Sequence, residues 1–124
     1  MDSSAPLLLL LLMCSSIMVE AELKVYDLRV RNLPFLTDSY VKASCAGQSM
    51  GQTSISRDTN NPWWEEELYS STAQADHKLT LTVMDSDVIF DDKLGSCTTT
   101  LASGTHDKIC DENGWILYYS YTVK

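Results

Sequence analysis

The segment Lys78-Leu-Thr-Leu-Thr-Val-Met-Asp85 alternates apolar and polar side chains over most of its length. Successive side chains of a β-strand point to opposite faces, so the leucines and the valine line one face and the threonines line the other. This pattern is typical of an antiparallel strand with one face in the core and one in water. The segment Trp115 to Val123 alternates in the same way. The sequence therefore predicts a domain of half-buried strands.

The rest of the chain after residue 21 shows the same alternation, and no part of it repeats apolar residues at the spacing of a helix. Gly, Asn and Pro, which favour turns, separate the alternating segments. Short strands at these intervals predict an all-β fold, an eight-stranded antiparallel β-sandwich. The predicted strands are Leu23 to Asn32, Tyr40 to Ala46, Gln48 to Ile55, Trp64 to Ser70, Lys78 to Asp85, Leu94 to Leu101, a short piece near His106 to Cys110, and Trp115 to Val123.

Residues 1–21 are interpreted as a secretory signal peptide, which leaves residues 22–124 as one domain. An apolar run from Leu7 to Val19 precedes Val19-Glu20-Ala21, which resembles a cleavage site. The run is too short to span a bilayer. Of the 124 residues, 103 remain after cleavage, which is enough for one compact core. We therefore expect a secreted, extracellular protein.

The expected mature chain is acidic. Without Asp2 and Glu20, 15 of the 17 acidic residues remain against 9 basic ones, which gives a net charge of −6. Such a chain is repelled by nucleic acid and by anionic membranes unless a cation intervenes. We expect no nucleic-acid partner.

Three cysteines remain after the predicted cleavage, in a compartment that permits disulfides. Cys97 and Cys110 lie on either side of a turn-rich stretch, and we predict a disulfide between them. Cys45 alternates with Val41 and Ala43 on a predicted strand. We interpret it as a buried free thiol that packs as a small hydrophobic residue.

Two acidic clusters are candidates for a metal site. Asp38 lies in Thr-Asp-Ser-Tyr-Val-Lys42, and the run Met84 to Asp92 holds four more aspartates. If successive strands run up and down, the connections Leu33 to Ser39, Ser56 to Trp63 and Asp85 to Lys93 emerge at one end of the sandwich. Carboxylates from flexible loops suit calcium, which takes six to eight oxygen ligands. The apolar stretch Val88 to Phe90 between these carboxylates indicates a loop that meets lipid.

Several of these segments together resemble the C2 domain family. They are Leu23 to Leu33, Asp38-Ser-Tyr-Val-Lys42, Asn61-Pro-Trp-Trp-Glu-Glu-Glu-Leu68, Leu81-Thr-Val-Met-Asp-Ser-Asp87 and Lys93-Leu-Gly-Ser-Cys97. Within the family the chain is most similar to the C-terminal C2 domain of perforins. The order of the first and last segments resembles the type II topology.

The resemblance implies a set of calcium ligands. Asp38 in the first loop and Asp85, Asp87 and Asp92 in the third match the carboxylates of the family, and Asp91 is an adjacent candidate. The first loop is shortened and lacks an earlier aspartate that resembling domains use to bridge two ions. We therefore expect one Ca²⁺ ion of modest affinity as the cofactor.

The resemblance also implies a partner, the phospholipid membrane, which a C2 domain binds peripherally when calcium neutralises its acidic loops. Apolar residues of the three loops would insert into the headgroup region. The expected membrane-contacting residues are Phe35, Leu36, Trp63, Val88, Ile89 and Phe90. The similarity to perforin C2 domains implies a role in innate immune, antimicrobial or antiparasitic defence.

Catalysis is not expected, because His77 and His106 do not lie in a motif with a nucleophile. We expect no small-molecule substrate, and a monomer by default. The alternative is that the chain is a module that binds a protein or a glycan without calcium. In that case the aspartates bind no metal. A purely structural extracellular protein is a third possibility.

Overall fold

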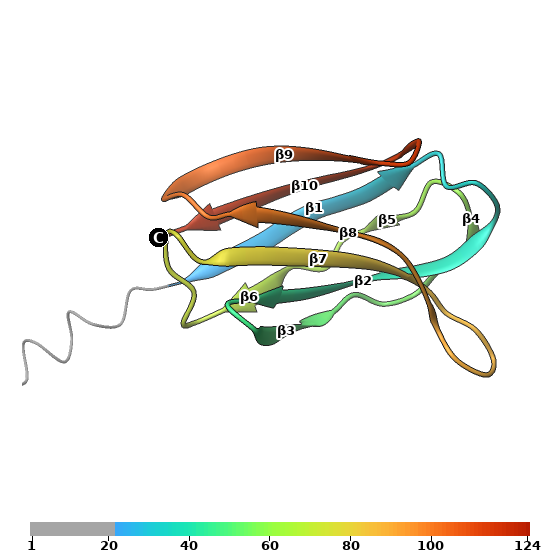
Figure 1. The fold of residues 1–124 in the computed structure, drawn as a ribbon, viewed down its shortest axis with the longest axis horizontal. Coiled ribbons are helices and arrows are strands. Elements are labelled where there is room, and N and C mark those ends of the chain that lie inside the picture. Colours follow the sequence, from blue (N-terminus) through green and yellow to red (C-terminus); the bar gives the residue numbers. More distant parts are fainter. Residues whose placement is uncertain (1–21) are drawn as a thin grey trace, which may run out of the picture.

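The computed structural model describes residues 22–124 as a sandwich of two antiparallel sheets (Figure 1). In the first sheet the strand order is β5-β1-β10-β9, and β6 also pairs with β1. In the second sheet the order is β3-β2-β7-β8, and β4 also pairs with β2. The predicted signal peptide lies outside the described residues. No helix within residues 22–124 has the length and apolar character needed to cross a membrane.

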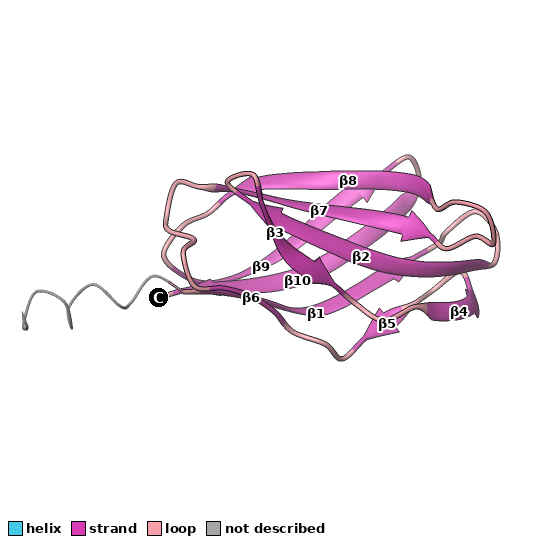
Figure 2. Ribbon diagram, turned by 90° about the horizontal axis from the view of Figure 1, so that it is seen from below, coloured by secondary structure: helices cyan, strands magenta, loops and turns pink. Residues whose placement is uncertain are grey.

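The strands differ in length: the short strands β3 to β6 all pair with β1 or β2, and the long strands β8 and β9 form the opposite edges of the two sheets (Figure 2). Their bounds are β1 Leu23–Arg31, β2 Thr37–Cys45, β3 Gln48–Gln52, β4 Ser56–Thr59, β5 Trp63–Trp64, β6 Leu68–Ser70, β7 Lys78–Asp85, β8 Asp92–Thr100, β9 Gly104–Glu112 and β10 Trp115–Val123.

The predicted all-β sandwich is confirmed, but the predicted number of eight strands is wrong. The segment predicted as Gln48 to Ile55 ends at Gln52, and a separate strand, β4, follows it. The segment predicted as Trp64 to Ser70 is divided into β5 and β6, which pair with different parts of β1. These short strands lie at the sheet edges, where pairing with β1 or β2 decides their bounds and local alternation gives a weak signal.

The core lies between the inward faces of the two sheets. Leu79, Leu81 and Val83 of β7 are completely buried, as their alternation predicts. Trp64 is also buried, at 2 % exposure, and packs in the same cluster. Burial of such side chains stabilises a fold by roughly 1.5–3 kcal/mol each, which makes this cluster the main source of stability.

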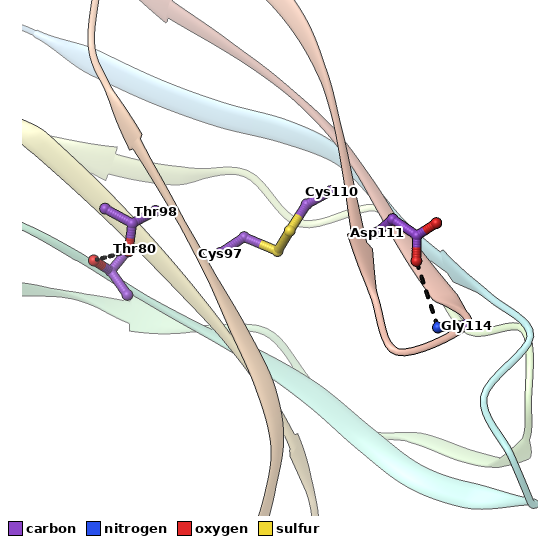
Figure 3. Close-up of a disulfide and its surroundings, with 6 residues drawn as sticks. All are labelled: Thr80, Cys97, Thr98, Cys110, Asp111 and Gly114. Atoms are coloured by element: carbon purple, nitrogen blue, oxygen red, sulfur yellow. Dashed lines mark hydrogen bonds between the residues drawn. A yellow bond between two sulfur atoms is a disulfide. The ribbon is translucent and has the colours of Figure 1, made fainter.

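A disulfide joins the two sheets at one edge, as predicted. Cys97 of β8 and Cys110 of β9 are bonded, with their Cα atoms 6.3 Å apart (Figure 3). Because β8 and β9 belong to different sheets, the bond ties the open edges of the sandwich together. Cys45 has no disulfide partner within residues 22–124 and is buried, which agrees with its predicted packing role. Burial raises the pKa of its thiol.

Strand β1 contains a bulge that resets its side-chain alternation. Asp27 has a positive φ of 54°, and the register with β10 shifts between Tyr26 and Arg29. One extra residue on β1 keeps Val25 and Leu28 both buried despite their odd separation. As a result, the polar residues on either side of the bulge share the outer face of the sheet.

Candidate functional site

Three connections meet at one end of the sandwich, which we call the rim. They are residues 32–36 between β1 and β2, residues 60–62 between β4 and β5, and residues 86–91 between β7 and β8. A backbone hydrogen bond from Leu33 N to Asn60 O over 3.0 Å joins the first two connections, and one from Ser86 N to Asp38 O over 2.7 Å joins the third connection to β2. In Figure 1 the rim lies opposite the end of the sandwich that holds the C-terminus.

Asp38 and Asp85 are brought together at the rim by this pairing. The backbone N–H of Asp38 donates to Asp85 Oδ1 over 3.1 Å. Ser39, the next residue, lies opposite Asp85 in the register of β2 and β7. The two acidic clusters therefore converge, although 47 residues separate these two aspartates.

Both oxygens of the Asp38 carboxylate are engaged. Its Oδ1 accepts a hydrogen bond from the backbone N–H of Asp58 over 2.9 Å. Its Oδ2 lies 3.8 Å from the guanidinium of Arg57, which is a long ion pair with an exposed partner. Asp38, Arg57, Ser86, Asp87 and Val88 line a shallow hollow of about 210 Å³, which we call the rim hollow.

The third connection is held closed by hydrogen bonds between its own residues. Asp91 Oδ1 accepts the backbone N–H of Asp87 over 3.1 Å, and Asp87 Oδ1 accepts the N–H of Val88 over 2.6 Å. The other oxygen of Asp91 accepts the hydroxyl of Tyr40. Asp91 thus links the loop to strand β2.

Tyr40 is buried, at 5 % exposure, although alternation places it on the outer face of its sheet. Its hydrogen bond to Asp91, followed by burial and the negative charge of Asp91, raises the pKa of Tyr40 to about 12. The same hydrogen bond, with help from the N–H of Asp87 and the charge of Lys42, lowers the pKa of Asp91. Both shifts favour a neutral phenol that donates to an ionised carboxylate.

The structure places the predicted ligands in three situations. Asp38 and Asp85 are in contact, and Asp87 lines the rim hollow with Asp38. Asp92 is the first residue of β8 and lies opposite Asp85 in the register. Asp91 is engaged by Tyr40 and by the loop backbone. Within residues 22–124 no three such side chains are close enough together to hold a metal ion as they stand.

Two predicted positions need correction. Asp38 was expected in the first loop, but it is the second residue of β2, because pairing with β7 extends the strand to Thr37. The stretch from Ser56 to Thr59 was expected in a loop, but it forms β4 and pairs with β2. The connections at the rim are therefore shorter than the sequence indicates.

The chemistry of the donors fits calcium. Carboxylate oxygens are the ligands that this hard cation prefers, and Asp85 and Asp87 each have one oxygen outside the hydrogen bonds just described. The ion would be held by Asp38, Asp85 and Asp87, with Asp91 or Asp92 as a further ligand. The third connection would have to rearrange to hold the ion, because the acidic side chains of residues 22–124 do not form a group of three.

All six residues predicted to contact a membrane are exposed at the rim. The third connection presents Val88, Ile89 and Phe90 at 98 %, 86 % and 66 % exposure. The first connection presents Phe35 and Leu36, and Trp63, which was expected in the second connection, begins β5; each of the three is more than half exposed. Single exposed apolar residues are common on protein surfaces. Six of them toward one end of a small domain are typical of a surface that binds a membrane or another protein.

Sequence reasoning missed two residues of the rim, Tyr40 and Arg57. Alternation from Asp38 could have placed Tyr40 on the same face as the aspartate. Nothing local in the sequence pairs Tyr40 with Asp91, or Arg57 with Asp38, because these contacts arise from the packing of β2 against its neighbours.

Comparison with known proteins identifies the fold and the family. Residues 21–117 match the sequence profile of the C2 domain. A solved structure described as a C2 domain superimposes with a TM-score of 0.81 at 42 % identity, covering 84 % of this chain and 98 % of that one. The chain therefore belongs to the C2 domain family.

The sequence is also similar to perforin-1 of Mus musculus. The two are 32 % identical over 91 residues, which is 71 % of this chain and 16 % of perforin-1. The chain thus spans about one sixth of that protein. Human GIVD cytosolic phospholipase A2 matches at a TM-score of 0.70 and 23 % identity, over 83 % of this chain and 17 % of that one. At this identity the likeness concerns the fold alone.

Proposed function

We propose that this chain is a secreted C2 module that binds phospholipid membranes through the rim when calcium is bound. The observation that carries the proposal is the contact between Asp38 and Asp85 beside an apolar loop tip. C2 domains commonly bind membranes in a calcium-dependent manner, and this rim has the acidic and apolar residues that such binding needs. The pairing of the first strand with the last supports the type II order as part of the proposal.

A bound calcium ion would first reduce the negative charge of the rim. The rim is acidic, and a divalent ion held by Asp38, Asp85 and Asp87 would neutralise it and offer open coordination positions to phosphate oxygens. The residues of the chain would orient the ion at the membrane surface and set the depth to which the domain inserts into the membrane. Repulsion between the rim and an anionic surface then becomes attraction.

The apolar tips supply the second contribution. Full burial of a side chain such as Ile89 or Phe90 contributes roughly 1.5–3 kcal/mol. Two or three inserted side chains therefore add a binding energy comparable with that of the charged contacts. Trp63 suits the interface between headgroups and acyl chains, because its indole is apolar over most of its surface and polar at one atom.

A second candidate function is a calcium-independent module for a protein or a glycan. The hydrogen bonds of Asp38 and Asp91 favour it, because these carboxylates already have partners without a metal. We place it second, since it leaves the exposed tip from Val88 to Phe90 without a role. The proposal also includes a role in immune defence, and its only basis is the similarity to perforin-1.

Vesicle sedimentation with phosphatidylcholine and phosphatidylserine tests the proposal, in calcium and in chelator. The wild-type protein is expected to sediment more strongly with vesicles in calcium than in chelator, and Asp85→Asn with Asp87→Asn is expected to abolish this gain. The matched control is Glu22→Gln with Asp76→Asn, which removes two charges at the opposite end of the sandwich. Equal sedimentation in chelator and calcium would exclude the proposal and favour the second candidate.

A further inference from the structure

A hollow on the outer face of the first sheet contains two arginines and has no part in the calcium site. Its volume is about 550 Å³, and it lies beside the rim. We call it the arginine hollow, and it is lined by Arg29, Arg31, Asn32, Asn61, Ile116 and Tyr118.

Strand alternation after the bulge in β1 places both arginines on the same face. Leu28 and Val30 are completely buried, so Arg29 and Arg31 between and beside them point outward. The guanidinium of Arg29 lies over the ring of Tyr118 at 4.6 Å from its centroid. This stacking holds the guanidinium plane while leaving its edge N–H groups free to donate.

The two arginines are not neutralised by neighbouring carboxylates. The ion pairs within residues 22–124 are those of Arg57 and Lys124, so Arg29 and Arg31 have none. Asp27 and Asp107 line an adjoining hollow together with Arg29, and Asp107 accepts the hydroxyl of Ser120 over 2.6 Å. Two unpaired cations side by side are unusual in a chain with a formal net charge of −8.

The chemistry of this arrangement suits an oxyanion. Guanidinium groups bind phosphate through paired N–H donors, and two of them can hold one phosphate from two sides. At the edge of the hollow, Asn61 accepts the backbone N–H of Asn32 over 3.0 Å. Its amide nitrogen donates one N–H to Asn60 over 3.2 Å, which leaves its second N–H for a ligand.

The position of the hollow indicates where the phosphate comes from. Asn32 and Asn61 belong to the first and second connections of the rim; the first connection exposes Phe35 and Leu36, and the second leads directly into the exposed Trp63 of β5. Arg29 lies two residues further from the rim than Arg31, or roughly 7 Å along the strand. A membrane that receives the apolar tips would therefore bring its headgroups to the level of the arginine hollow.

We propose that the arginine hollow is a second lipid site, which holds the phosphate of an anionic phospholipid headgroup without calcium. The inference rests on the proposed function for the source of the phosphate, because the orientation of the rim toward a membrane is what identifies the oxyanion as a lipid headgroup. It adds a preference for anionic lipid that remains in chelator.

Vesicle sedimentation in chelator at low salt tests the second site. Vesicles of phosphatidylcholine alone are compared with vesicles that also contain phosphatidic acid. The test variant is Arg29→Gln with Arg31→Gln, and the matched control is Lys42→Gln with Lys78→Gln, which removes two charges from the other sheet. A thermal unfolding scan of each variant verifies that it is folded, and Arg29→Lys with Arg31→Lys keeps the charge without the paired donors.

The wild-type protein and the control Lys42→Gln with Lys78→Gln are expected to bind phosphatidic acid vesicles in chelator. Arg29→Gln with Arg31→Gln is expected to bind them at least about tenfold more weakly, and Arg29→Lys with Arg31→Lys is expected to show intermediate affinity. All four proteins should still bind vesicles in calcium through the rim. Absence of wild-type binding in chelator, or equal binding by the glutamine variant, would overturn the second site.

Two competition experiments distinguish a lipid headgroup from other sources of the oxyanion. A comparison of binding in chelator and in calcium distinguishes this proposal from the proposed function of the rim. Full competition by inorganic phosphate at the same phosphate concentration would assign the hollow to free phosphate and overturn the lipid assignment. Full competition by heparin at matched charge would do the same in favour of a sulfated glycan. Binding in chelator that depends on the arginines, with no gain in calcium, would contradict the rim function while supporting the hollow.

Discussion

The backbone N–H of Asp38 donates to the carboxylate of Asp85 over 3.1 Å, and Ser86 N donates back to the carbonyl of Asp38 over 2.7 Å. This reciprocal pair fixes the start of β2 against the end of β7. It orients one Asp85 oxygen before any metal arrives, so less ordering remains to be done when an ion binds. If the rim binds calcium as proposed, this pair organises part of the site in advance, and the third connection is the part that must move.

Replacement of Arg57 should strengthen calcium binding. The guanidinium lies 3.8 Å from Asp38 Oδ2 and acts as an internal cation that competes with the metal. Because Arg57 is exposed, the effect is that of a surface ion pair, roughly 0.2–1 kcal/mol, or up to about fivefold in affinity for Arg57→Gln. Calorimetric titration with calcium measures it, with Lys78→Gln as the control. Weaker binding by Arg57→Gln would indicate that the arginine supports the site.

The hydroxyl of Tyr40 should keep the third connection closed. Tyr40→Phe removes the hydrogen bond to Asp91 and leaves the ring in place. Amide hydrogen exchange at Asp87, whose N–H donates to Asp91, should become faster, while exchange in the core of β7 should stay as it is. Unchanged exchange at Asp87 would show that Asp91 is held by other contacts.

The same hydrogen bond gives a defined dependence on pH. The pKa of Asp91 is lowered in the folded state, so the ionised carboxylate stabilises the fold. This stabilisation is fully present above the ordinary pKa of 3.8 and is lost as the pH falls through the lowered pKa. The pKa of Tyr40 is raised from 10.0 to about 12, so its contribution is present below 10.0 and lost as the pH rises through about 12. Denaturant unfolding of wild type and Tyr40→Phe across pH should differ most between these limits. A difference that does not shrink in acid would contradict the assignment.

Loss of the disulfide should destabilise the domain without changing the rim. The bond closes a loop with a sequence separation of 13, for which the chain-entropy estimate is roughly 3 kcal/mol. Cys97→Ser with Cys110→Ser is expected to lower the free energy of unfolding by about that amount in a denaturant titration. The wild-type protein under reducing conditions is the matched control. Loss of calcium binding at a temperature where the variant is folded would show an unexpected link to the rim.

Gly95 should tolerate no side chain. A Cβ atom at this position would lie 2.7 Å from Cζ2 of Trp115 and 2.8 Å from Cγ of Glu112. Glu112 can move, but the indole is buried in the core, so Gly95→Ala forces the packing to shift at a cost of roughly 1–3 kcal/mol. Thermal unfolding measures this change, and Gly51→Ala, which has open space but a positive φ, separates steric conflict from backbone strain.

The apolar tip of the third connection should set vesicle affinity. Ile89→Ser with Phe90→Ser removes two exposed side chains, and the affinity for vesicles in calcium should fall by about tenfold or more. Calcium binding in the absence of vesicles should be unchanged, since neither side chain has an oxygen ligand. Tyr69→Ser, an exposed position on β6, is the control. A loss of calcium binding in the tip variant would mean that the loop had been disrupted.

Sequence patterns predicted the central strands well, because burial leaves a direct record in alternation. Leu79, Leu81 and Val83 are all completely buried, and Cys97 pairs with Cys110. Strand β4 was missed, and β5 and β6 were predicted as one strand, since their hydrogen bonds come from partners distant in sequence. The convergence of Asp38 and Asp85 followed from strand order alone. The contacts of Tyr40 and Arg57 did not, because they depend on three-dimensional packing between separate strands.

Calorimetric titration of the wild-type chain with calcium, without lipid, tests the central claim most directly. The account predicts binding with a dissociation constant on the order of 10⁻⁴ to 10⁻³ M, as in extracellular calcium modules. It also predicts that Asp85→Asn with Asp87→Asn abolishes binding while Glu22→Gln with Asp76→Asn retains it. No binding by the wild-type protein, or equal binding by the Asp85 and Asp87 variant, would contradict the account.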